Sequence, residues 1–126
     1  KQTTMNKDLE SLISYLLHSV NQTHVFHLQT KSYAEHMALG AYYDGVSDLL
    51  DGLVEGYQGK HDIIKQYDNF KLESYTGKPQ LETYFKALST KVEQTHSKVK
   101  ETFIQNQLDT IDELINSTLY KIRFLG

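Results

Sequence analysis

The chain has 126 residues, of which 39% are hydrophobic, which is enough for one domain with a modest core. Its 16 acidic and 13 basic residues give a formal charge of −3, and the scattered bases argue against a dedicated binder of nucleic acid or anionic membranes. The absence of cysteine excludes disulfides, zinc ribbons and thiol catalysis. No run of about 18 apolar residues and no secretory signal is visible, so we expect a cytoplasmic protein with a single domain over residues 1–126.

Apolar residues recur at intervals of three and four through most of the chain, and there is only one proline. This pattern predicts an all-helical fold. The first helix should run from about Asn6 to near Thr30. His24 and His27 lie on the same stripe as its apolar residues, so we expect both histidines to face inward.

The second helix should begin at Ser32, because Ser32 and Glu35 have the spacing of a capping box, and should end near Gly56 and Gly59. A helical wheel separates its apolar stripe from an acidic stripe and a face of small residues. Each glycine in a helix costs about 1 kcal/mol relative to alanine, so we expect a partner helix to approach the small face closely. The acidic stripe comprises Asp44, Asp48, Asp51 and Glu55, and the small-residue face comprises Ala34, Ala38, Ala41, Gly45, Gly52 and Gly56.

After the second helix comes a connection with an apolar patch at residues 63–67, which could form a short helix across the bundle, and then a turn at residues 76–79. The third helix should carry apolar residues from Leu81 to Phe103, and the fourth from Leu108 to Leu125. The sequence therefore predicts a four-helix bundle with a short helix in the connection between the second and third helices.

Four residues form the best candidate for a functional site. His24 and His36 are twelve residues apart, Asp51 follows fifteen residues later, and Glu55 lies one helical turn beyond. Imidazoles and carboxylates without neighbouring cations favour a divalent transition metal. His36 and Asp51 would lie roughly 22 Å apart on one helix, so they cannot bind the same ion. Two copies packed antiparallel about a two-fold axis would instead bring the histidines of one to the acids of the other.

The spacing of these residues resembles the pattern of the Dps miniferritins, members of the ferritin-like superfamily, and small phage-encoded members look most similar. The pattern consists of a histidine, a second histidine twelve residues on, an aspartate fifteen beyond and a glutamate four further. The resemblance extends over most of the chain, through Tyr43-Asp44, Thr110-x-Asp112-x-Leu114 and Tyr120-Lys121-Ile122-Arg123-Phe124-Leu125.

The resemblance implies a ferritin-like four-helix subunit and a hollow dodecamer built from two-fold dimers. It implies oxidation of Fe(II) by hydrogen peroxide or oxygen, with the ferric mineral stored inside. His24, His36, Asp51 and Glu55 would be both the iron ligands and the catalytic residues, with Asp51 bridging two irons.

Two departures from the family pattern limit these expectations. Gly40 stands where the family has an acid one turn after the second histidine, so a second iron would depend on His27 or Asp44. The lysine-rich extension of DNA-binding members is absent, so DNA binding should be weak or absent.

Two other functions remain open: a ferritin-like shell without catalysis that serves a structural or DNA-associated role, and a small helical module that binds another protein through the acidic stripe. A lone histidine on an apolar stripe is more often a core residue, and this is the simpler interpretation of His27. Glu93-x-x-His96 has the spacing of an internal ferritin ligand motif, but such bundles use two copies and the sequence has one.

Overall fold

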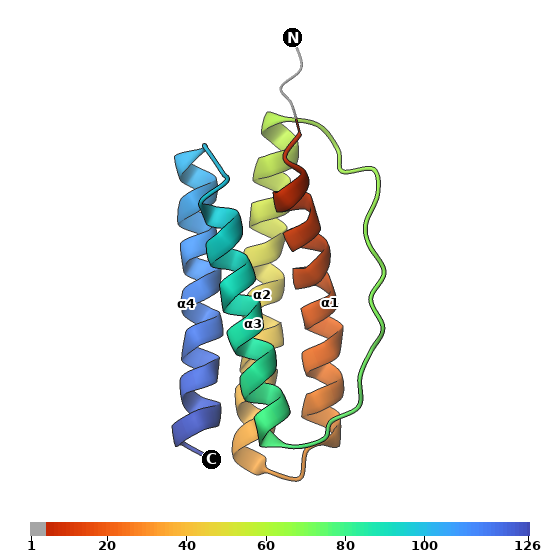
Figure 1. The fold of residues 1–126 in the computed structure, drawn as a ribbon, viewed down its shortest axis with the longest axis vertical. Coiled ribbons are helices and arrows are strands. Elements are labelled where there is room, and N and C mark those ends of the chain that lie inside the picture. The colour runs from red at the N-terminus through yellow and green to blue at the C-terminus, as the bar shows by residue number, and fades with distance from the viewer. Residues whose placement is uncertain (1–4) are drawn as a thin grey trace.

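The computed structural model describes residues 5–126, in which four helices form a bundle (Figure 1). No strand occurs in this part of the chain, so the prediction of an all-α four-helix fold is confirmed. None of these helices is long and apolar enough to cross a lipid bilayer. They are α1 (Lys7–Gln29), α2 (Tyr33–Lys60), α3 (Lys78–His96) and α4 (Thr102–Phe124).

The order of the helices in the bundle depends on one long connection. α1 and α2 are antiparallel, as are α3 and α4, but α2 and α3 run in the same direction because the segment between them returns along the length of the bundle (Figure 1). α1 packs against α2 and α3, and α4 packs against the same two helices. The core between them is apolar, and each helix contributes fully buried side chains, among them Leu16, Leu39, Phe85 and Ile111.

The start of α2 confirms the predicted cap at Ser32, whose hydroxyl accepts a hydrogen bond from the Glu35 amide at 3.2 Å. The Glu35 carboxylate does not turn back to the Ser32 amide, which donates to the Thr30 hydroxyl at 3.1 Å instead. Glu35 accepts from the hydroxyls of Thr30 and Tyr75, at 2.7 and 2.6 Å. The cap therefore also attaches the connection after α2 to this end of the bundle.

The predicted short helix in the connection is wrong, because residues 62–77 are extended and contain no helix. Backbone groups of this segment are satisfied by side chains of α1. The buried Gln22 side chain donates to the Glu73 carbonyl and accepts from the Glu73 amide, both at 2.8 Å. Two further amides bond to α1, Asp68 to the Ser14 hydroxyl at 3.0 Å and Tyr75 to the Gln29 side chain at 2.6 Å.

The predicted extension of the third helix to Phe103 is also wrong. α3 ends at His96, and Phe103 lies in the first turn of α4. Val99 sits in the turn between the two helices and is buried, with 4% of its surface exposed. It therefore continues the apolar periodicity of α3 without being helical.

The small-residue face of α2 packs against α4. A Cβ atom at Gly45 would lie 3.2 Å from the Leu114 side chain, and one at Gly56 would lie 3.1 Å from the ring of Phe103. The expectation of a close neighbour is thus confirmed, but the neighbour belongs to the same chain. This face consequently gives no support to pairing between two copies.

Candidate functional site

Three histidines meet where the end of α1 packs against the start of α2, and we call His24, His27 and His36 the imidazole cluster. The rings of His27 and His36 stack with their centroids 3.6 Å apart and an interplanar angle of 18°. His27 Nδ1 lies 2.6 Å from the carbonyl oxygen of His36, and His36 Nδ1 lies 2.9 Å from that of His27. The two residues therefore hold each other through reciprocal bonds.

These bonds fix the tautomer of both rings. A carbonyl oxygen can only accept a hydrogen bond, so both Nδ1 atoms must donate. The neutral form of each ring then carries its lone pair on Nε2. Metal-binding histidines usually have this arrangement, in which the second ring nitrogen donates to a carbonyl or carboxylate and orients the ligand. The Nε2 atoms of His27 and His36 are therefore the ring nitrogens that could bind a cation.

His24 lies beside this pair on the protein surface. Its ring stacks on Tyr43 with centroids 4.4 Å apart, and its centroid is 5.9 Å from that of His27. The prediction that His24 faces inward is wrong, because Thr23 and Phe26 occupy the buried positions of α1 at this level. His27 is partly buried, in closer agreement with the prediction.

Gly40 accounts for the position of the His27 ring. A Cβ atom at Gly40 would lie 3.2 Å from Cε1 and 3.3 Å from Nδ1 of His27. Contacts this short would force the ring to move. The absence of a side chain at Gly40 thus leaves the space in which the His27 imidazole sits.

The predicted acidic ligands lie elsewhere on α2. Asp51, Glu55 and Asp44 are exposed, and none forms an ion pair within the described chain. Asp51 lines a shallow hollow between α1 and α2 of about 190 Å³, together with Leu17 and others. Eight residues separate Asp51 from Tyr43, which corresponds to roughly 12 Å along the helix. The outer face of α1 and α2 that carries these groups, which we call the α1–α2 face, therefore has an imidazole end and a carboxylate end.

One chain does not complete a metal site with these residues. Within residues 5–126, no group of three or more histidine, aspartate or glutamate side chains is placed to hold a metal ion. The structure brings His24 and His36 into one cluster but leaves Asp51 and Glu55 apart from it. The bundle interior offers no alternative, since Glu35 is the only buried acidic residue among those that the structure describes.

The Glu93-x-x-His96 motif does not point into the bundle. His96 Nε2 pairs with the carboxylate of Asp109 on α4 at 3.2 Å, and both side chains are partly or largely exposed. Glu93 is exposed on α3. This single copy of the motif therefore contributes no ligand to the bundle interior.

A histidine–carboxylate pair that the sequence did not predict lies at the opposite end of the bundle. His61 Nε2 donates to the Glu101 carboxylate at 2.6 Å, and the His61 side chain is 5% exposed. Burial by itself raises the pKa of Glu101, but the bond from His61 and the nearby positive charges outweigh it and lower this pKa overall. Forty residues separate the partners, so no local pattern indicates the pair.

Comparison with models of protein families matches residues 27–122 to a family of unknown function, DUF5856. The match includes His27, His36, Asp51 and Glu55 and begins after His24. No curated protein and no solved structure matches the chain.

Proposed function

The chain belongs to DUF5856, a family of unknown function, so we propose a function from its site. We propose that it is a Dps-like miniferritin that oxidises Fe(II) with hydrogen peroxide or oxygen and stores the ferric product in a cage. The observation that carries this proposal is the pair formed by His27 and His36, in which both Nδ1 atoms bond to carbonyls and both Nε2 atoms are left to bind metal.

The connectivity of the bundle supports the finer assignment to the ferritin-like folds. Those folds are four-helix bundles with one long crossover connection. Here residues 61–77 form such a connection between two antiparallel helix pairs (Figure 1). Among residues 5–126 the interior does not hold the paired carboxylates and histidines of the larger ferritin-like proteins, so we place the iron site on the α1–α2 face instead.

The separation of the ligands supports a site shared by two subunits. A two-fold axis across the α1–α2 face would place the imidazole end of one copy opposite the carboxylate end of the other, and would form two identical sites. His24 and His36 of one subunit would then bind iron with Asp51 and Glu55 of its partner. Two-fold dimers of this kind would be the building blocks of a hollow dodecamer, which light scattering after size-exclusion chromatography would detect.

The donor set suits iron as the substrate of this site. Imidazole nitrogens and carboxylate oxygens give mixed ligation with positions open to an oxidant. Two Fe(II) ions held together would supply the two electrons that, with two protons from solvent, reduce one hydrogen peroxide to two waters and leave two Fe(III), so no hydroxyl radical is released. Asp51 would bridge the ions. His27 takes the space that an acid at position 40 would occupy, so it is the better candidate than the exposed Asp44 to replace the missing ligand.

The proposal is tested by mixing apo-protein with Fe(II) and hydrogen peroxide and following the ferric absorbance. Asp51→Asn should slow oxidation by about tenfold or more, because it removes a charged ligand and keeps the shape of the side chain. Asp48→Asn is the matched control, because Asp48 belongs to the same exposed stripe and is not a proposed ligand. Equal rates for the wild type and both variants, or no oxidation by the wild type, would rule the proposal out.

A further inference from the structure

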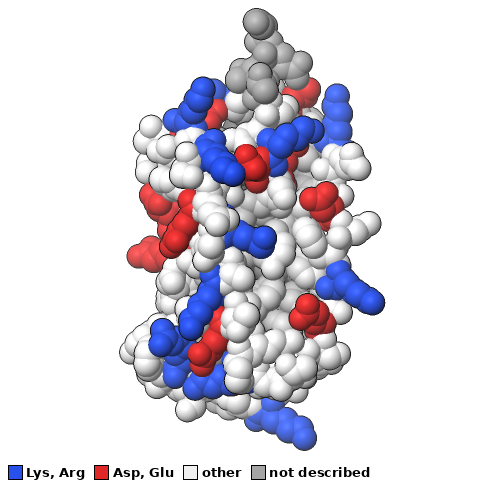
Figure 2. Space-filling view, in the orientation of Figure 1, with Lys and Arg blue, Asp and Glu red and all other residues white. Residues whose placement is uncertain are grey.

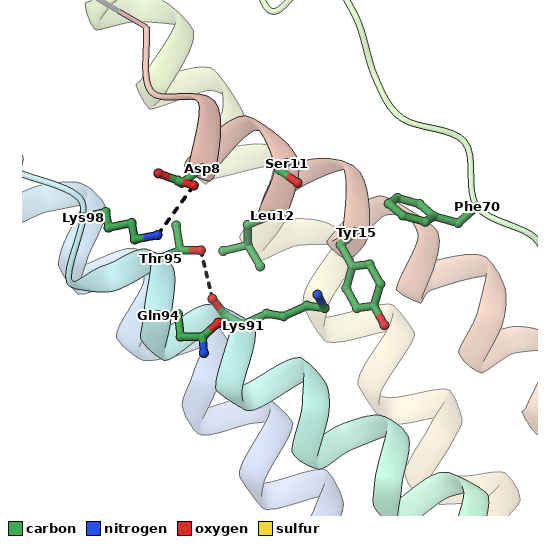
Figure 3. A pocket seen from close by; sticks show the side chains of 9 residues that line it. All are labelled: Asp8, Ser11, Leu12, Tyr15, Phe70, Lys91, Gln94, Thr95 and Lys98. Atoms are coloured by element: carbon green, nitrogen blue, oxygen red, sulfur yellow. Dashed lines mark hydrogen bonds and ion pairs between the residues drawn. The ribbon is translucent and has the colours of Figure 1, made fainter.

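A second candidate site lies in the seam between α1 and α3, remote from the imidazole cluster (Figure 3). It is a hollow of about 260 Å³, which we call the α1–α3 hollow. Its lining combines cationic, aromatic and apolar side chains, chiefly Lys91, Lys98, Tyr15, Phe70 and Leu12. A few polar groups converging on an apolar surface are the usual composition of small-molecule sites.

The aromatic wall is held in place by the crossover connection. Phe70 belongs to the extended segment, and its ring meets that of Tyr15 edge to face, with centroids 5.3 Å apart. The backbone is bonded to α1 on both sides of Phe70, at Asp68 and at Glu73. Phe70 is 40% exposed and therefore presents part of its ring at the rim of the hollow.

The cations of the hollow are weakly compensated. Lys91 Nζ lies 4.8 Å from the centroid of the Tyr15 ring and forms no ion pair within residues 5–126 (Figure 3). Lys98 Nζ is 3.7 Å from the Asp8 carboxylate, but these side chains are 56% and 58% exposed. Such an exposed pair contributes little, so an incoming anion can replace Asp8 as the partner of Lys98.

The surroundings add further positive charge. An adjoining hollow shares Asp8 and Lys98 and is also lined by Lys7, Lys100 and Glu101. Together the two hollows carry four lysines against two carboxylates, although the whole chain has a formal charge of −3. Figure 2 shows basic side chains gathered, with a few acidic ones, over the upper part of the molecule in this view. A local excess of one sign attracts ligands of the other.

From this arrangement we propose that the α1–α3 hollow binds a small anion that carries one aromatic ring. The anionic group lies between Lys91 and Lys98, and the ring packs on Leu12 and Phe70. The volume of the hollow is just below the range of about 300–1,000 Å³ usual for drug-sized ligands, so it suits one ring and one charged group. This site is independent of the proposed iron chemistry.

Phenyl phosphate contains both parts of such a ligand and is the probe that tests the proposal. Titration into the full chain would be followed by amide chemical shifts in NMR at constant ionic strength. Phenyl phosphate should bind at least about tenfold more tightly than either phenol or inorganic phosphate, because each of these offers only one of the two contacts. Benzoate in a parallel titration distinguishes a carboxylate from a phosphate as the preferred anionic group.

Lys91→Gln should weaken phenyl phosphate binding by about fivefold or more, because it removes the charge and keeps most of the side chain. Lys86→Gln is the matched control, an exposed lysine of α3 that does not line the hollow, and should leave affinity unchanged. Shifts should centre on Leu12, Tyr15 and Phe70. Binding of phenyl phosphate no tighter than inorganic phosphate, or an equal effect of both substitutions, would overturn the proposal.

Discussion

At one end of the α1–α2 face the rings of His27 and His36 are fixed by backbone carbonyls, whereas at the other end Asp51 and Glu55 have no cationic partner within the described chain. The imidazole end is complete in its geometry, and the carboxylate end has uncompensated charge. The carboxylate end does not stabilise a single folded chain, because like charges one turn apart on a helix, such as Asp51 and Glu55, are destabilising. The proposed site shared by two copies would bring these two unlike ends together.

The largest effect on stability should come from the imidazole end. His27→Ala removes the bond from the His27 ring to the His36 carbonyl, removes the ring on which His36 stacks, and opens space beside Gly40. We expect a loss of about 2 kcal/mol in the free energy of unfolding, measured with urea. A variant as stable as the wild type would show that the reciprocal pair does not organise this end.

A carboxylate that does have a partner provides the next comparison. Glu101→Gln should cost about 1.5 kcal/mol at neutral pH, because it removes the charge of the carboxylate that accepts the hydrogen bond from His61. In the wild type the pKa of Glu101 is lower in the folded state than in the unfolded state. The contribution of Glu101 to stability is therefore fully present above its unfolded pKa and is lost as the pH falls through its folded pKa.

The stability of the wild type should therefore decline below about pH 4, and Glu101→Gln should reduce the slope of that decline. Thermal unfolding from pH 3 to pH 7 measures both slopes. Asp51→Asn is the control, because Asp51 forms no ion pair in the described chain. Parallel slopes for wild type and Glu101→Gln would contradict the assignment.

Alanine substitutions at two glycines of α2 distinguish the effect of helix propensity on stability from the effect of crowding the His27 ring. Gly52→Ala should stabilise the chain by about 0.5–1 kcal/mol, because its Cβ would make an ordinary contact of 3.7 Å with Gln107. Gly40→Ala should lose this gain, because its Cβ would press on the His27 ring. Urea unfolding of both variants measures the difference, and equal stabilisation would show that the ring is free to move.

The smallest effect is expected at the carboxylate end. Asp48→Asn should raise the free energy of unfolding by about 0.3 kcal/mol at low salt, because it relieves repulsion from Asp44 and Asp51 on the same stripe. The gain should vanish at high salt, which screens exposed charges. A loss of stability at low salt would mean that Asp48 has a favourable partner.

Periodicity and capping signals were sufficient to predict four helices, the start of α2 and the exposed acidic stripe. Apolar periodicity gave wrong helix boundaries where apolar residues are buried by segments that are not helical. Val99 continues the apolar period through a turn, and the apolar residues 63 and 64 belong to an extended segment whose backbone bonds to α1. Neither arrangement has a local signature, because each depends on residues brought together by the fold.

The separation of His36 from Asp51 and Glu55 along α2 was predictable from the sequence, but the arrangement of the histidines was not. The His27–His36 pair depends on the positions of two carbonyl groups on different helices. Gly40 was a visible signal, since a glycine one turn after His36 leaves room for a side chain from α1. The sequence alone could not show which side chain fills that room.

The central claim, that two copies share each iron site, is tested most directly by mixing inactive variants. His24→Ala and Asp51→Asn should each oxidise Fe(II) slowly alone, but their co-assembly should restore about a quarter of the wild-type rate, because half of the dimers are mixed and each has one intact site of two. Co-assembly of His24→Ala with His36→Ala, which damage the same half, should restore nothing. If the first mixture is no faster than its components, the sites are not shared and the account is wrong.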